Sequence, residues 1–189
     1  MRMQKHIKIC TLLLCITLLL PSFAFAIDVQ LSGIKVASTT DNLLLSLKVE
    51  GAFNEKLEEA VLNGIPATFS FFVNLNRLRT LWADEQIVEL NVTHTLKYHN
   101  LKNHYIIKKS WQDNKPVITE SFDEAKKMMS EINGLKIVPL KKLRKGSRYQ
   151  ITAKAELDKV KLPFLLNYIL FFASLWDFET EWHSHEFVY

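Results

Sequence analysis

The sequence of 189 residues predicts a mainly β protein, an antiparallel β-sandwich with two short helices and an apolar C-terminal helix. Three observations lead to this prediction. Several segments alternate apolar and polar residues, as half-buried strands do. Only two segments carry both the start and the stop residues of a short helix. Strand-like and helix-like segments follow each other too irregularly for a parallel, doubly wound sheet.

The predicted strands account for most of the chain. In order they are Asp28–Ala37, Asn42–Val49, Thr68–Leu75, Gln86–Tyr98, His104–Ser110, Arg148–Leu157 and Phe178–Val188. The first strand changes face at Ser32-Gly33, which predicts a β-bulge. Thr68–Leu75 is apolar almost throughout, which predicts a strand buried on both faces. The short connection Asn100–Asn103 predicts a hairpin between the fourth and fifth strands.

Two short helices are predicted from their capping residues. Asn54 can cap a helix over Glu55–Leu62, and Gly64 provides its end. Ser121–Glu124 has the S-x-x-E pattern of a capping box, which opens a helix that we expect to run to Ile132.

A third helix is predicted over Pro163–Leu175, within the segment PFLLNYILFFASLW. Its proline suits a first helical turn, and its length falls short of the roughly 20 residues that cross a bilayer. A helix that is apolar on nearly every side is buried in a core, lies on a membrane or packs against a partner protein. The candidate interaction residues are Phe164, Leu166, Leu170, Phe171 and Trp176, together with the later Trp182.

The first 26 residues have the three parts of a secretory signal peptide. Positions 2–8 carry three basic residues and no acidic one, Ile9–Leu20 is nearly all apolar, and Ala24 and Ala26 form an A-x-A cleavage site. We therefore expect cleavage after Ala26, which leaves a single β-rich domain of residues 27–189 in the periplasm. The alternative is an uncleaved signal that anchors the protein in the inner membrane.

Loss of this segment changes the charge and the cysteine content. The chain has 24 Lys and Arg against 20 Asp and Glu, and three basic residues leave with the signal, so the expected net charge is +1. Both cysteines leave as well, which excludes disulfides, thiolate metal sites and cysteine nucleophiles. The basic run at 141–148 is typical of a solvated loop. In an exported protein such a run meets anionic lipid head groups, and we expect no nucleic acid partner.

The sequence contains no motif of catalytic chemistry. It lacks a Gly-x-Ser-x-Gly elbow, a Walker loop and a Gly-x-Gly-x-x-Gly turn, so we expect a non-enzymatic protein without a cofactor. If the last strand is regular, Glu179, Glu181, His183 and His185 share one face. The two histidines and Glu181 are then weak candidates for a metal site and for a metal-dependent hydrolase. A solvent-facing polar edge is the simpler interpretation.

Three further histidines recur at intervals of five around the predicted hairpin. These are His94, His99 and His104. Such spacing matches neither one helix face nor one strand face, which favours ordinary strand and turn histidines over a pH-sensitive surface.

Diffuse aromatic and proline positions carry a resemblance to a known family. They are Leu162-Pro163, Leu175–Phe178 and Trp182, with Leu96–His99, Tyr105 and the Ser121–Glu124 helix start that precedes Gly146–Tyr149. Over most of residues 28–189 the chain resembles the DUF4390 family of uncharacterised bacterial envelope proteins. The resemblance implies a bacterial, exported protein of unknown function with a connection to signalling, and it supplies no catalytic residue.

The leading functional prediction is a non-enzymatic envelope module that binds another protein or a membrane surface. The aromatic residues Trp111, Trp176, Trp182 and Tyr189 and an unusually apolar helix favour such a role. The alternative is a periplasmic carrier that holds a small apolar ligand between sheet and helix. We make no prediction of the oligomeric state.

Overall fold

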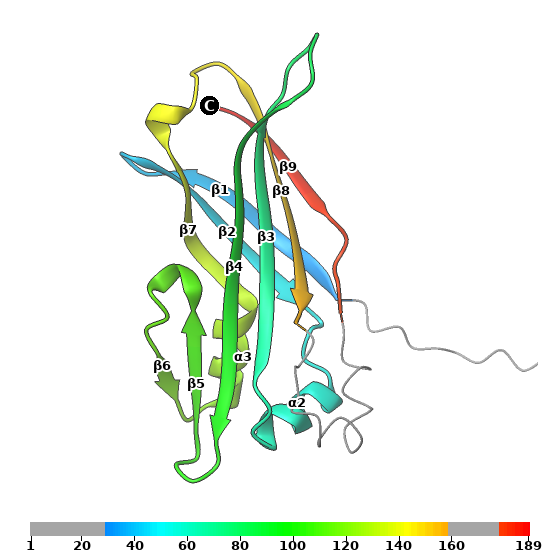
Figure 1. Cartoon of the computed structure of the whole chain (residues 1–189), viewed down its shortest axis with the longest axis vertical. Helices are drawn as coiled ribbons and strands as arrows, with labels where there is room; N and C mark the ends of the chain where they lie inside the picture. Colours follow the sequence, from blue (N-terminus) through cyan, green and yellow to red (C-terminus); the bar gives the residue numbers. More distant parts are fainter. Residues whose placement is uncertain (1–28, 159–177) are drawn as a thin grey trace, which may run out of the picture.

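The structure is a computed structural model that describes residues 29–158 and 178–189. Two antiparallel sheets dominate it (Figure 1). The smaller sheet has the order β1-β2-β7, from β1 (Gln30–Ser38), β2 (Asn42–Glu50) and β7 (Glu131–Pro139). The larger sheet has the order β6-β5-β4-β3-β8-β9, from β6 (Val117–Thr119), β5 (His104–Lys109), β4 (Glu85–His99), β3 (Ala67–Arg77), β8 (Arg148–Leu157) and β9 (His183–Val188).

Two short α-helices accompany the sheets within the described residues. They are α2 (Glu55–Leu62) and α3 (Phe122–Ser130), and the 3-10 turns η1 (Ser110–Gln112) and η2 (Leu140–Lys142) complete the elements. The mainly β class, the antiparallel sheets and the two short helices are therefore as predicted. The predicted signal peptide of residues 1–26 and the predicted apolar helix Pro163–Leu175 lie outside the described residues. No helix in the described ranges has the length and apolar character to span a membrane.

One hydrophobic core joins the two sheets. Alternate residues of β2, from Leu43 to Val49, belong to the same core as Phe69, Phe71 and the buried face of β8. Figure 1 shows the strands of the smaller sheet crossing those of the larger one obliquely. The prediction that β3 is buried on both faces is wrong, because its second face carries the partly exposed residues Phe72, Asn74 and Asn76.

The predicted bulge in β1 is confirmed. The register between β1 and β2 shifts between Ser32 and Lys35, and Gly33 has a φ of +62°. A residue without a Cβ adopts this left-handed conformation without steric cost, which explains a glycine at the change of face.

The caps of the two helices follow from the sequence, but one helix is shorter than predicted. The Leu57 backbone N–H donates to Asn54 Oδ1 at 2.8 Å, and the Glu124 N–H donates to Ser121 Oγ at 3.3 Å. The second helix ends at Ser130 and not at Ile132. The chain continues directly as β7, which pairs with β2 and buries the Ile132 side chain. Tertiary burial of this apolar residue thus overrides its place in the helical pattern.

The last strand is shorter than predicted and enters with an offset. Glu179 forms an isolated bridge with Glu156, whereas β9 itself begins with His183 opposite Ala153. From Glu179 to His183 the chain advances by four residues, whereas the facing segment from Glu156 to Ala153 spans only three. One extra residue therefore lies between Glu179 and His183, and it reverses the face to which the following side chains point. His185 lies opposite the buried Ile151, while Glu179 points to the outer face. The predicted common face for Glu179 and the two histidines is therefore wrong.

Candidate functional site

Basic side chains gather at the end of the larger sheet where β3 ends and β8 begins. Arg77 pairs in the sheet with Glu85 of β4 and with Tyr149 of β8. Loops 78–84 and 140–147 extend beyond these pairs and lie at the top of Figure 1. We call residues 77–85 and 140–149 the arginine end. They contain seven Lys or Arg and two Asp or Glu, although the net charge of the whole chain is only +4.

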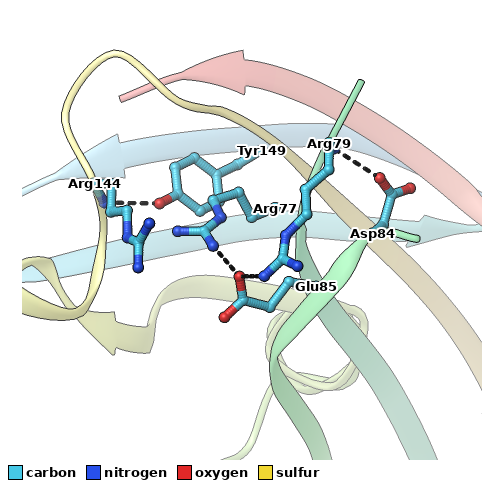
Figure 2. Close-up of polar contacts among 6 residues, drawn as sticks. All are labelled: Arg77, Arg79, Asp84, Glu85, Arg144 and Tyr149. Atoms are coloured by element: carbon cyan, nitrogen blue, oxygen red, sulfur yellow. Dashed lines mark hydrogen bonds and ion pairs between the residues drawn. The ribbon is translucent and has the colours of Figure 1, made fainter. Parts of the chain in front are cut away.

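A single carboxylate serves two guanidinium groups at this end. Glu85 Oε2 accepts hydrogen bonds from the Nη2 atoms of both Arg77 and Arg79 (Figure 2). The Arg77 side chain is only 11% exposed, whereas Arg79 and Glu85 are 39% and 38% exposed. The hydrogen bond from Arg79, reinforced by the charges of Arg77, Arg79 and Arg144, holds the pKa of Glu85 below its usual value. Glu85 is therefore ionised at neutral pH.

A third arginine is fixed beside this pair through its backbone. Tyr149 is fully buried, and its hydroxyl accepts a hydrogen bond from the Arg144 N–H at 2.8 Å. Its ring stacks on Phe187 with centroids 5.7 Å apart. Figure 2 shows the Arg144 guanidinium on the opposite side of Arg77 from Arg79. Within the described chain Arg144 forms no ion pair, so Arg77 and Arg79 share the Glu85 carboxylate and the Arg144 guanidinium has no carboxylate partner.

Two large, exposed apolar side chains also belong to the arginine end. Leu81 is 88% exposed and Trp82 is 79% exposed, in the loop between β3 and β4. The base of that loop is tied by the Arg79 N–H, which donates to Asp84 Oδ1 at 3.0 Å. An indole that projects from a tethered loop beside cationic groups is typical of contacts with membrane interfaces and with proteins.

The predicted interaction residues do not form this site. Trp182 is 50% exposed and lies on the outer face of the larger sheet, where Lys154 Nζ is 5.5 Å from its ring centre. Lys154 also pairs with Glu179 at 2.6 Å. The other predicted residues, Phe164, Leu166, Leu170, Phe171 and Trp176, lie outside the described residues.

The weak metal candidates are not brought together into a ligand cluster. His183 Nδ1 lies 3.1 Å from the backbone oxygen of Glu181, and the side chains of Glu181 and His185 are exposed. Residues 29–158 and 178–189 contain no group of three or more His, Cys, Asp or Glu side chains placed to hold a metal ion.

The histidines of the hairpin have different surroundings. His99 and His104 face each other across the β4–β5 pair, with ring centroids 5.4 Å apart. His94 is fully buried, with Nδ1 2.9 Å from the Met129 carbonyl oxygen. The Trp111 indole N–H donates to His94 Nε2 at 2.9 Å. This pattern requires a neutral ring with its proton on Nδ1, and burial lowers the pKa of His94 to about 4.

A groove of about 640 Å³ opens between the end of β2 and α3. Its lining includes the charged residues Lys48, Glu50, Lys126, Lys127 and Glu131. Lys126 is already bonded to Glu58 at 3.0 Å, which raises the pKa of the amine. The groove therefore combines charged groups, one of which is already paired, with the apolar residues Val49, Ala52 and Phe53.

The arginine cluster was only partly visible in the sequence. Arg144 belongs to the basic run at 141–148, whereas Arg77 and Arg79 follow the predicted strand Thr68–Leu75 and were not identified as candidate residues. A detectable pattern was the stretch RLRTLWADE at 77–85, in which basic and acidic residues flank an apolar pair. That pattern alone does not show that Arg144, which lies 65 residues after Arg79, joins the group.

Comparisons with known proteins give a family and no function. The model of the family described as "Domain of unknown function (DUF4390)" matches residues 26–186. No curated protein and no solved structure matches the chain.

Proposed function

The chain belongs to the DUF4390 family, whose description gives no function, and we propose that it is a non-enzymatic envelope module that docks on an anionic membrane surface through its arginine end. The signal-like residues 1–26 support export, so the surface in question is one that faces the periplasm.

The observation that carries the proposal is the exposure of Leu81 and Trp82 within the most basic part of the fold. Membrane attraction grows by about 1 kcal/mol for each Lys or Arg held near an anionic surface. Indole rings favour the level of the lipid head groups, where an apolar body and a polar N–H are both accommodated. One end of the domain supplies both contributions. The bond between Arg79 and Asp84 closes the base of one loop, and the bond from Arg144 to Tyr149 ties the other loop to the sheet.

Flotation with liposomes tests this proposal. The protein of residues 27–189 should float with vesicles that contain anionic lipid and stay behind with neutral vesicles. Leu81→Ser combined with Trp82→Ser should reduce the bound fraction at least fivefold. The matched control is Leu101→Ser, because Leu101 is 92% exposed in the β4–β5 turn, away from the arginine end. Absence of flotation by the native protein, or equal losses in both variants, would refute docking through this end.

The alternative carrier function has less support. A carrier of a small apolar ligand needs a largely apolar cavity, and the groove beside α3 mixes five charged residues with Val49, Ala52 and Phe53. Organic extraction followed by mass spectrometry would still detect a retained ligand. Recovery of one apolar compound in stoichiometric amount would favour the carrier over the docking module.

A further inference from the structure

We infer that Arg77, Arg79 and Arg144 recognise the phosphate group of an anionic phospholipid, and that Glu85 occupies their donors in the unbound protein. This inference rests on the proposed membrane docking and adds to it the chemical group that is recognised.

The charge balance of the cluster is the first step. Three guanidinium groups face one ionised carboxylate, that of Glu85. Asp84 is the other acidic residue of segments 77–85 and 140–149, and its Oδ1 accepts from the backbone of Arg79 and not from a guanidinium. The described cluster therefore has an excess of positive charge that an incoming anion can neutralise.

The burial of the cluster is the second step. Arg77 forms a nearly buried base, while Arg79 and Glu85 are each about two-fifths exposed. A ligand from solvent can therefore reach the donors without opening of the core. Planar guanidinium forks match the oxygen atoms of a phosphate and bind them in bidentate fashion, which a lysine ammonium does not.

The arrangement of Glu85 is the third step. One oxygen atom, Oε2, accepts from both Arg77 and Arg79, whereas the Arg144 guanidinium on the other side of Arg77 is not bonded to this carboxylate. A phosphate has more acceptor oxygen atoms than this one atom and can bridge the guanidinium groups. Glu85 repels such an anion and competes for the same donors, so removal of its charge should strengthen binding.

The neighbouring loop indicates a lipid as the source of the phosphate. Leu81 and Trp82 lie two and three residues after Arg79, so a ligand that reaches Arg79 also lies close to this exposed apolar pair. Free phosphate has no apolar part that could pack against Leu81 and Trp82. A phospholipid presents phosphate at the surface and acyl chains just beneath it, and so can satisfy both.

Vesicles of matched surface potential test the inference. One set contains phosphatidic acid and the other oleic acid, each in a neutral galactolipid that has no phosphate. We expect the native protein to bind the phosphatidic acid vesicles about tenfold more tightly, the ratio that corresponds to about 1.4 kcal/mol. Glu85→Gln should tighten binding to phosphatidic acid vesicles severalfold. Arg79→Gln with Arg144→Gln should remove the preference.

The control is Lys141→Gln with Lys142→Gln, which removes the same charge from exposed positions in η2. It should weaken binding to both vesicle types alike. Equal binding of the native protein to phosphatidic and oleic acid vesicles would overturn phosphate recognition and leave membrane docking intact. No binding to either type would overturn docking itself. Inorganic phosphate that binds as tightly as the vesicles, by titration calorimetry, would overturn the lipid as the source.

Discussion

The arginine end and the surroundings of His94 are two polar clusters in one fold, and they differ in almost every physical respect. The His94 ring is fully buried and neutral, and both of its nitrogen atoms have partners within the protein. The arginine end is open and charged, and its donors outnumber the carboxylate that they share. Polar groups that serve the fold are satisfied internally. Exposed donors in excess are open to solvent, and we propose that those of the arginine end bind a membrane surface.

Removal of the buried imidazole should have the largest effect. His94→Ala leaves the Trp111 indole N–H and the Met129 carbonyl without partners and opens a cavity in the core. We expect a loss of about 3–5 kcal/mol in the free energy of unfolding, measured by urea denaturation. A loss below about 1 kcal/mol would mean that the cluster contributes little to the fold.

Acid should destabilise the protein through the same residue. The pKa of His94 is about 4 in the folded state, against 6.5 for an unperturbed histidine. Between these values the unfolded chain binds the proton and the folded protein does not, so stability falls as the pH decreases from about 6.5 to 4. The expected decrease is about 3 kcal/mol. His94→Gln should flatten the plot of unfolding free energy against pH in this range. An unchanged slope would mean that titratable groups other than His94 cause the loss of stability.

The hydroxyl of Tyr149 links stability to the arginine end. Tyr149→Phe leaves the Arg144 N–H without its buried acceptor and frees loop 140–147 at this point. We expect a loss of about 1–2 kcal/mol in stability, together with a smaller preference for phosphatidic acid vesicles. If stability falls by this amount while the lipid preference is unaltered, the Tyr149 hydroxyl is not needed to position Arg144 for lipid binding.

The exposed ion pair should matter least for the fold. Arg79→Gln removes a charge that is well exposed to solvent, and surface ion pairs contribute little. The urea midpoint should therefore stay within error of the native value while the preference for phosphatidic acid vesicles declines. A clear decrease in the midpoint would make Arg79 a structural residue.

The sequence predicted what depends on local pattern. The bulge at Gly33, the cap at Asn54 and the alternation of β2 were all visible in short stretches. It missed β7, because Ile132, Asn133 and Gly134 resemble the end of a helix while pairing with β2 decides their conformation. It also missed β6, which has only three residues.

The candidate site depended on contacts between distant parts of the chain. Arg77 and Arg144 belong to different elements, and only the pairing of β3 with β8 brings their segments together. The offset ahead of β9 likewise separates Glu179 from His183, which no count along the sequence reveals. Patterns within one element were predictable, whereas a site shared by several elements was not.

Two candidate membrane contacts can be separated by mutation, the arginine end and the predicted apolar helix Pro163–Leu175. The Leu157 N–H donates to the Phe178 oxygen at 3.0 Å and the Asp158 N–H to the Thr68 oxygen at 2.8 Å, so Asp158 and Phe178 both lie near the start of β3. The arginine end lies at the other end of this strand, which has 11 residues and a length of roughly 35 Å.

Flotation with anionic liposomes, with one variant from each end, tests the central claim most directly. Leu81→Ser with Trp82→Ser alters the arginine end, and Leu166→Asp with Leu170→Asp alters the apolar segment; circular dichroism checks that both variants remain folded. Docking through the arginine end predicts that only the first variant stops floating. Flotation by the first variant and its loss in a folded second variant would contradict the account and assign the contact to the apolar segment.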